Sequence, residues 1–347
     1  MRPLFRLIAL GVALCAGLVG GGIMAQDNPA AQSNQPVNHP PEHTAQFPNL
    51  GAGETREEVT QSFDSAPQLQ RGMPARELLM QRRRLDQALG DLQPQRPGIV
   101  EAYVVTIALD SDPVFAREAR EAARVLARRY DAAGRTLALA GPDGMRDDLP
   151  QGSIESLLVA LAHLAEVMDT DEDALVLYTT SHGNKLGLAY HYGDTGYGVL
   201  SPARLKAVLE ELGIARRILI ISACYSGVFV PDLASADTAI LTAAASERTS
   251  FGCQPENDWT FYGDALINRA LRQPVALEEA ARQAGLSLAD WEIKARVLAS
   301  LPQVSIGAGA REWLAQIEAR MPRQASAPVG RPAFDPAQFN QPVPAAR

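Results

Sequence analysis

Hydrophobic residues between positions 97 and 271 follow two alternating patterns. Short stretches are almost continuously apolar and rich in β-branched residues, which is typical of strands buried on both faces. Between them, apolar residues recur at helical spacing, as from Pro113 to Tyr130. The pattern predicts strands over EAYVVTIAL (101–109), RTLALAG (135–141), DALVLYTTSHG (173–183), RRILIISA (216–223) and DTAILTAAAS (237–246).

Helix start signals precede several of the periodic segments. Ser153 can cap a helix that runs to Met168, and Ser201 can cap another that ends at Gly213. A Gly-rich stretch before Ser201 predicts a small hairpin or loop. Further helices are expected over residues 74–92, 259–271 and 277–321. Alternating strands and helices predict an α/β fold: a three-layer α/β/α sandwich with a mostly parallel central sheet.

The first 25 residues combine two arginines with a long apolar run. This pattern predicts an export signal, and therefore a periplasmic or secreted protein. The apolar run is also nearly long enough to cross a bilayer, so an uncleaved anchor that attaches the chain to the inner membrane is the alternative.

Both ends of the chain differ in composition from the middle. Residues 26–71 are rich in Gln, Asn, Pro and Ala without periodicity, which predicts a disordered linker or a pro-segment. Residues 322–347 are rich in Pro and Ala and predict a disordered tail. The remaining residues, 72–321, are expected to form one compact domain, with a helix at its start and helices at its end.

Composition narrows the classes of function. Hydrophobic residues make up 46% of the 347 positions, which is ample for a core. Without residues 1–25, 30 basic residues face 40 acidic ones, a net charge of −10 that disfavours nucleic-acid binding. Only Cys224 and Cys253 then remain, so no disulfide framework is indicated. No zinc-type spacing of Cys and His occurs, and we expect neither a metal nor another cofactor.

Two of the expected strands end in residues with catalytic chemistry. His182 follows one apolar strand and Cys224 follows the next, with one helix of crossover length between them. Functional side chains of an open parallel sheet gather beyond the carboxyl ends of its strands. The sequence therefore predicts that an imidazole and a thiol share one cleft.

This pair suits nucleophilic catalysis. A histidine and nearby amide dipoles favour the thiolate and can return a proton to the leaving amine. The amides of Gly183 and Cys224 could stabilise an oxyanion. An inert core cysteine is the alternative for Cys224, although the paired placement at strand ends favours catalysis. An α/β-hydrolase is disfavoured because its nucleophile precedes its histidine.

The sequence resembles the legumain family of cysteine peptidases, specifically its bacterial members, within the wider caspase-like superfamily. The resemblance runs from about Pro97 to Leu271. It rests on the apolar strand into SHG (181–183), the apolar strand into ACYSG (223–227), and their order and separation. It implies that His182 and Cys224 are catalytic and that Gly183 contributes to the oxyanion hole.

The resemblance also implies a specificity pocket. Arg117, Ser250 and Asp264 match the family's pocket positions, and an arginine with an acid suits the side-chain amide of Asn. Ser222 stands where the family has a pocket acid, so we expect Asp to be tolerated as well. The family's histidine-orienting asparagine is also missing, because Phe115 stands nearest its place. Asp112 is the candidate substitute.

We therefore expect a cysteine endopeptidase that cleaves peptides or proteins after Asn or Asp through a Cys-His dyad. A transamidase or peptide ligase with the same dyad is one alternative. A noncatalytic peptide-binding module is another. His191 is interpreted as an exposed loop residue, and Cys253 as a packed thiol rather than a second nucleophile.

Overall fold

The apolar stretches of the sequence form a six-stranded central sheet in the computed structural model, which describes residues 51–65, 68–141 and 148–335. Strand order is β10-β9-β8-β4-β2-β3. Five strands run parallel, and β10 pairs antiparallel with β9 at one edge. The strands are β2 (Ala102–Ala108), β3 (Thr136–Leu139), β4 (Ala174–Thr180), β8 (Arg217–Ser222), β9 (Thr238–Thr242) and β10 (Gln303–Ile306).

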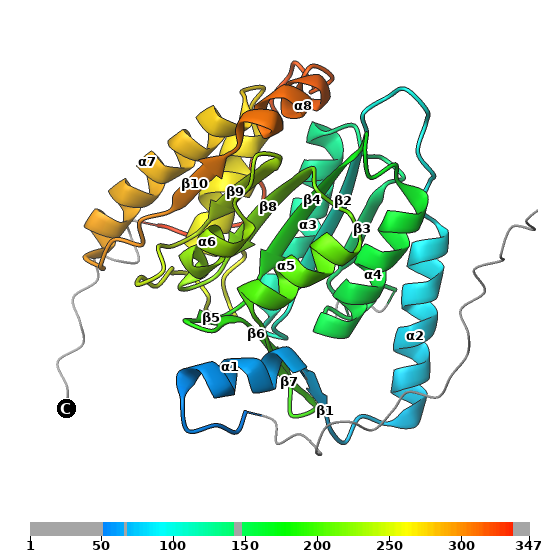
Figure 1. Cartoon of the computed structure of the whole chain (residues 1–347). Coiled ribbons are helices and arrows are strands. Elements are labelled where there is room, and N and C mark those ends of the chain that lie inside the picture. Colours follow the sequence, from blue (N-terminus) through cyan, green and yellow to red (C-terminus); the bar gives the residue numbers. More distant parts are fainter. Residues whose placement is uncertain (1–50, 66–67, 142–147, 336–347) are drawn as a thin grey trace, which may run out of the picture. The chain divides into compact units, whose positions relative to one another are not determined.

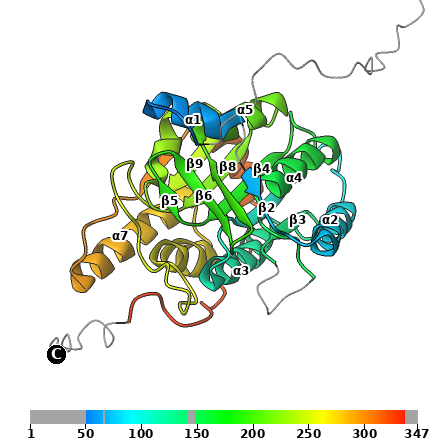
Figure 2. The ribbon, with the colours of Figure 1, turned by 90° about the horizontal axis from the view of Figure 1, so that it is seen from below.

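Helices cover both faces of this sheet, as Figures 1 and 2 show. Each face has its own hydrophobic core. The first face carries α3 (Pro113–Arg129), the π-helical turn η2 (Gly263–Arg269), η3 (Ala270–Arg272), α7 (Leu277–Ala295) and α8 (Ala308–Glu318). The second carries α2 (Ala75–Gly90), α4 (Ile154–Val167), α5 (Pro202–Glu211), η1 (Ser226–Phe229) and α6 (Val230–Leu233). The predicted three-layer α/β/α sandwich with a mostly parallel sheet is confirmed.

The predicted caps begin their helices. The Ser153 hydroxyl accepts a hydrogen bond from the Ser156 amide at 3.0 Å, and the Ser156 hydroxyl accepts one from the Ser153 amide at 2.9 Å. The Ser201 hydroxyl accepts one from the Arg204 amide at 3.1 Å. These bonds satisfy amides that have no partner inside the helix, so α4 and α5 start where the sequence predicts.

The Gly-rich stretch forms a hairpin within a second sheet of order β1-β7-β6-β5. Its strands are β5 (Gly183–Asn184), β6 (Gly187–Tyr192), β7 (Gly196–Leu200) and β1 (Gln68–Gln70). In Figure 1 this sheet lies below the central sheet, with helix α1 (Arg56–Ser65) beside it. The expectation of a disordered segment over 26–71 is therefore wrong for α1 and β1. It missed β1 because three residues are too few to show a period.

The end of the chain also differs from expectation. The segment 277–321 contains the strand β10 between α7 and α8, because α7 ends at Arg296 in a left-handed conformation (φ 57°) and the β-branched residues of QVSI then pair with β9. The expected disordered tail is ordered up to residue 335. Phe334 is buried, and the Trp259 indole donates to the Val329 carbonyl at 2.9 Å.

Residues 1–50, 66–67, 142–147 and 336–347 lie outside the described residues, and so do the predicted signal or anchor and most of the predicted linker. The described residues belong to one compact unit, residues 48–347. Within them, no helix combines the length and the apolar character needed to cross a membrane.

Candidate active site

Three neighbouring strands bring their carboxyl ends to one edge of the sheet. β4 lies between β2 and β8, and all three are parallel. Asp110 and Asp112 follow β2, His182 follows β4, and Cys224 follows β8. The prediction that the strands of His182 and Cys224 are adjacent is confirmed. The Ser181 amide donates to the Ser222 carbonyl at 3.2 Å, which extends the pairing to the last residues before the site.

Gly183 lies directly against Cys224. A Cβ atom at position 183 would stand 2.3 Å from the Cys224 carbonyl oxygen and 3.0 Å from the Ala223 Cβ. Both contacts are closer than side-chain atoms normally approach, so only glycine allows the two strand ends to meet. The missing Cβ of Gly183 thus makes room for Cys224.

The Cys224 thiol is held by the backbone of Ser250. The Ser250 amide donates to Cys224 Sγ at 3.3 Å, and the thiol donates to the Ser250 carbonyl at 3.5 Å. Burial raises the pKa of the Cys224 thiol, while the Ser250 hydrogen bond lowers it. Ser250 thus lies beside Cys224, and a backbone amide is available to a thiolate there.

His182 is partly exposed and contacts three different groups. Its Nε2 lies 3.5 Å from Asp112 Oδ2, and its ring meets the Phe115 ring edge to face with centroids 5.1 Å apart. A hydrogen bond with the Cys253 side chain raises the pKa of His182 to about 9, against the opposing effect of burial; Asp110 and Asp112 raise it further. The raised pKa favours the imidazolium form of His182.

The buried carboxylate of Asp110 contacts the residues around His182. Asp110 is only 4% exposed; its Oδ2 lies 3.4 Å from His191 Nδ1, and its Oδ1 accepts the Asp112 amide at 2.9 Å. Ligand atoms of Asp110, Asp112 and His182 lie within 4.8 Å of one another, a spacing that could hold a metal ion. Since Asp110 and Asp112 already engage the two histidines, we assign both carboxylates to positioning the imidazoles.

Arg117 reaches the loop after Cys253 rather than Asp264. Its guanidinium donates to the carbonyls of Pro255 and Asn257, and its Nε lies 3.8 Å from Asp258 Oδ1. The Arg117 and Asp258 side chains are 32% and 28% exposed, so a ligand can reach both. The acid that accompanies this arginine is Asp258.

The prediction that Asp264 lines a pocket is wrong for this structure. Its side chain is fully buried and forms an ion pair with Arg269 at 3.1 Å. It also accepts hydrogen bonds from Asn268 at 2.8 Å and from the Ala333 amide at 2.9 Å. Asp264 therefore ties η2 to the end of the chain, a role that its Gly-Asp motif does not reveal.

Ser222 is also buried, and a second acid lies next to it. The Ser222 hydroxyl donates to Glu118 Oε1 at 3.2 Å. Glu118 is fully buried and accepts further hydrogen bonds from the hydroxyls of Tyr178 and Thr180 and from the Thr260 amide. The acid that the resemblance expects at position 222 has a spatial counterpart in Glu118 of α3, so a carboxylate does lie below this part of the site.

Sequence reasoning missed the roles of Asp110, Glu118, Cys253 and Asp258. Asp110 carried a usable signal, because it follows an apolar strand as His182 and Cys224 do. The only sequence signal for Glu118 was a charged residue on the apolar face of a predicted helix, four residues before Ala122 on that face. The approach of Cys253 to His182 depends on an irregular loop, which has no periodic signal.

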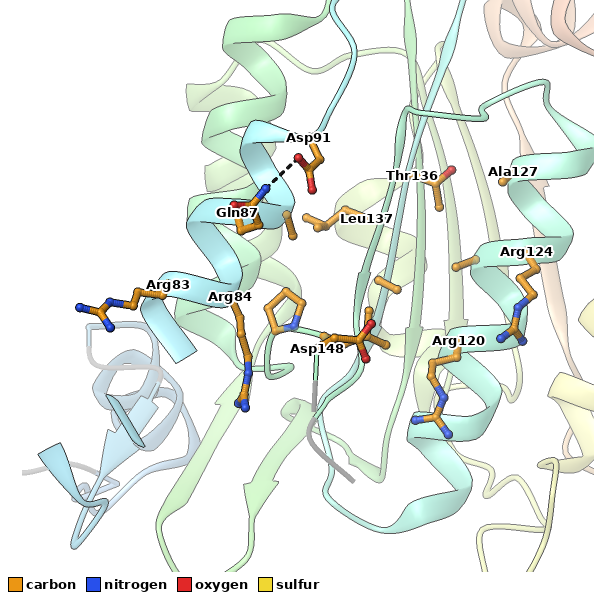
Figure 3. Close-up of a pocket in the computed structure, with 15 residues that line it drawn as sticks. Arg83, Arg84, Gln87, Asp91, Arg120, Arg124, Ala127, Thr136, Leu137 and Asp148 are labelled. Atoms are coloured by element: carbon orange, nitrogen blue, oxygen red, sulfur yellow. Dashed lines mark hydrogen bonds between the residues drawn. The ribbon is translucent and has the colours of Figure 1, made fainter. Parts of the chain in front are cut away.

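A cavity of about 660 Å³ lies away from these residues, between α2 and α3 at the edge strand β3. Figure 3 shows Arg84 on α2 and Arg120 and Arg124 on α3 around it, while the Arg83 side chain points away from α3. None of the residues predicted for the site lines this cavity.

Comparisons with known proteins agree with the chemistry of this edge. Residues 156–301 match the peptidase C13 family, the legumain family, and the matched region contains His182 and Cys224. A crystal structure of caspase-1 from Spodoptera frugiperda is similar over 62% of this chain and 88% of that chain, with 14% sequence identity and a TM-score of 0.40. A search of curated proteins found no match.

The protein is a cysteine-type peptidase. Its region 156–301 is similar to the legumain family of such peptidases.

Proposed function

We propose that the protein is an endopeptidase that uses Cys224 and His182 to cleave peptide bonds after Asn, and more slowly after Asp. The observation that carries this proposal is the contact between the two strand ends, where Gly183 packs on the Cys224 carbonyl. That contact brings an imidazole and a thiol to adjacent positions at the edge where parallel sheets hold their functional groups.

The reaction follows from the groups at this edge. Cys224 gives its thiol proton to His182, Sγ attacks the carbonyl carbon as the thiolate, and the amides of Gly183 and Cys224 stabilise the resulting oxyanion. His182 donates a proton to the nitrogen of the leaving amine, so the C–N bond breaks and a thioester remains. His182 then takes a proton from water, whose oxygen attacks the thioester and releases Cys224.

A raised pKa suits the acid step of this sequence, because it favours the protonated His182 that gives its proton to the leaving amine. Substrate must draw the ring away from Cys253 and toward the leaving nitrogen, while Asp112 keeps the imidazolium paired. In this proposal Asp112 orients the His182 ring, the role for which the sequence made it a candidate.

The selectivity for Asn follows from Arg117 and Asp258. An arginine donates to the side-chain carbonyl of Asn, and a carboxylate accepts from its NH₂ group. An Asp side chain has no donor for Asp258 and meets its charge, so Asp should react more slowly. Glu118 adds negative charge below the site, which further reduces the tolerance for Asp that Ser222 alone suggested.

The test is cleavage of fluorogenic peptides with Asn, Asp, Arg or Ala before the reporter. We expect the rates to fall in the order Asn, Asp, and then the other two. Asp258→Asn should narrow the difference between Asn and Asp, whereas Asp264→Asn should lower stability and leave the order unchanged. Equal rates for all four peptides would refute the proposed pocket.

The transamidase and the binding module remain alternatives from the same cleft. An added amine nucleophile distinguishes the first, because a ligase gives a product whose mass includes the amine. Peptide binding without any product distinguishes the second. His182 and Cys224 together favour turnover over binding alone.

Export is a further part of the proposal and rests on residues 1–25 alone. The N-terminal mass of the protein isolated from a periplasmic fraction tests it. A mature N-terminus near residue 26 supports a cleaved signal, and an intact N-terminus in the membrane fraction supports the anchor. A full-length chain in the cytoplasm would refute export.

A further inference from the structure

Two cysteines lie near His182 at the active edge. Cys224 Sγ accepts a hydrogen bond from the Ser250 amide at 3.3 Å, and Cys253 follows Ser250 by three residues. Cys253 packs on the cluster that contains Phe115, and the Phe115 ring meets the His182 ring with centroids 5.1 Å apart. The residue after His182, Gly183, rests on the Cys224 carbonyl. Both cysteines are therefore neighbours of the His182 segment.

Both thiols are accessible and reduced. Neither cysteine forms a disulfide, and both are partly rather than fully buried. A small oxidant such as hydrogen peroxide can therefore reach them. Redox-active cysteines typically combine such exposure with a nearby second cysteine that can resolve the oxidised sulfur.

We propose that Cys253 is a resolving cysteine, which closes a reversible disulfide with Cys224 when peroxide oxidises the nucleophile. The modification would switch the peptidase off, because the sulfur that attacks the substrate becomes part of the S–S bond. It would also remove Cys253 from His182.

The two steps balance without any other reactant. Peroxide transfers one oxygen to the Cys224 thiolate, which becomes a sulfenic acid, and hydroxide leaves. The Cys253 thiolate then attacks the Cys224 sulfur; the S–S bond forms, the S–O bond breaks, and the second hydroxide leaves. His182, whose raised pKa favours its protonated form, can protonate that leaving group. A dithiol reverses the change by exchange.

Closure of the disulfide requires a rearrangement of the segment that carries Cys253. Gly252, the residue before Cys253, has a φ of +90°, and its carbonyl accepts the Asn257 side-chain amide at 2.9 Å. The Phe261 amide donates to the Phe251 carbonyl at 2.9 Å. The Asn257 bond to Gly252 is therefore a contact that the rearrangement would have to break or carry along.

A resolving cysteine has a protective consequence. A sulfenic acid that meets no second thiol is oxidised further to sulfinic acid, which reducing agents do not reverse. With Cys253 present, peroxide should arrest the enzyme in a recoverable form. Without it, the same exposure should destroy the nucleophile.

The experiment uses the full chain carrying Cys15→Ser, so that only Cys224 and Cys253 can react. This protein and its Cys253→Ser and Cys224→Ala variants are treated with hydrogen peroxide and mapped by mass spectrometry of unreduced peptides. We expect a peptide pair linked through Cys224 and Cys253, lighter by two hydrogen atoms and released by a dithiol. Cys253→Ser should instead carry a sulfinic acid at Cys224.

Activity gives the second readout, each protein being compared with its own untreated sample. The parent should recover most of its activity after a dithiol, and Cys253→Ser should recover little. Sulfinic acid at Cys224 in the parent, or linkage only between separate molecules, would overturn the inference. The switch in activity rests on the proposed function, but the disulfide does not. A linked peptide pair from a protein that cleaves no substrate would refute the peptidase and leave the disulfide standing.

Discussion

Gly183→Ala tests whether the two strand ends must touch for catalysis. The new Cβ would lie 2.3 Å from the Cys224 carbonyl oxygen, and ordinary contact begins at 3.4 Å. The backbone must therefore separate by the difference, 1.1 Å. Since the φ of Gly183 is not in the left-handed region, alanine adds crowding without conformational strain.

A displacement of this size has calculable consequences. Misplacing a catalytic group by ~1 Å costs about a hundredfold in rate, so kcat/KM on an Asn peptide should fall by about that factor. Overpacking should lower the free energy of unfolding by about 1–3 kcal/mol. Steady-state kinetics and urea unfolding measure the two effects. The alkylation rate of Cys224 by iodoacetamide shows whether the thiol itself has been disturbed.

Gly285→Ala is the matched control. A Cβ there has no atom within 4 Å, and the residue lies in helix α7 far along the chain from the site. Alanine should leave kcat/KM unchanged and raise stability by up to about 1 kcal/mol. Wild-type activity and stability in Gly183→Ala would refute the reasoning, because the contact with Cys224 would then impose no constraint.

Three further predictions concern the charges of the site. Asp112→Asn should lower kcat by about tenfold and lower the pKa of His182. The lower pKa should appear as a shift of the alkaline limb of the pH–rate profile to lower pH. An unchanged alkaline limb would contradict the positioning role of Asp112. Glu118→Gln should lower the free energy of unfolding, measured in urea, by about 2–4 kcal/mol, because the new NH₂ group would face buried hydrogen-bond donors. The control Glu312→Gln, at an exposed position, should change it by less than about 0.5 kcal/mol. The pKa of His182 is raised from 6.5 to about 9 by folding, so its stabilising effect should be complete below pH 6.5 and disappear as the pH rises through about 9. The Tm difference between wild type and His182→Gln should shrink over that range, and a difference independent of pH would argue against the shift.

The sheet and the placement of His182 and Cys224 at the ends of neighbouring strands could be predicted because their signals are local and periodic. Continuous apolar runs predict the five parallel strands, and a single crossover helix makes the strands of His182 and Cys224 neighbours. The same reasoning applied to Asp110 would have placed it at the site. Reactive side chains that directly follow a buried strand can thus be placed from the sequence when the order of the strands can be predicted.

The parts that could not be predicted depend on contacts between distant segments. Asp264 matches a motif position, but its environment is set by Arg269 and by a chain segment some seventy residues later. Cys253 meets His182 through a loop without regular spacing. β10 is four residues long and becomes visible only through its pairing with β9.

The most direct test of the account is the choice of nucleophile, because Cys253 rather than Cys224 is the thiol that raises the pKa of His182. The measurement is the rate of cleavage of an Asn peptide by wild type, Cys224→Ala and Cys253→Ala, with products identified by mass. The account predicts no cleavage by Cys224→Ala, and continued cleavage by Cys253→Ala with a pH profile shifted toward lower pH. Cleavage that survives in Cys224→Ala and is lost in Cys253→Ala would contradict it.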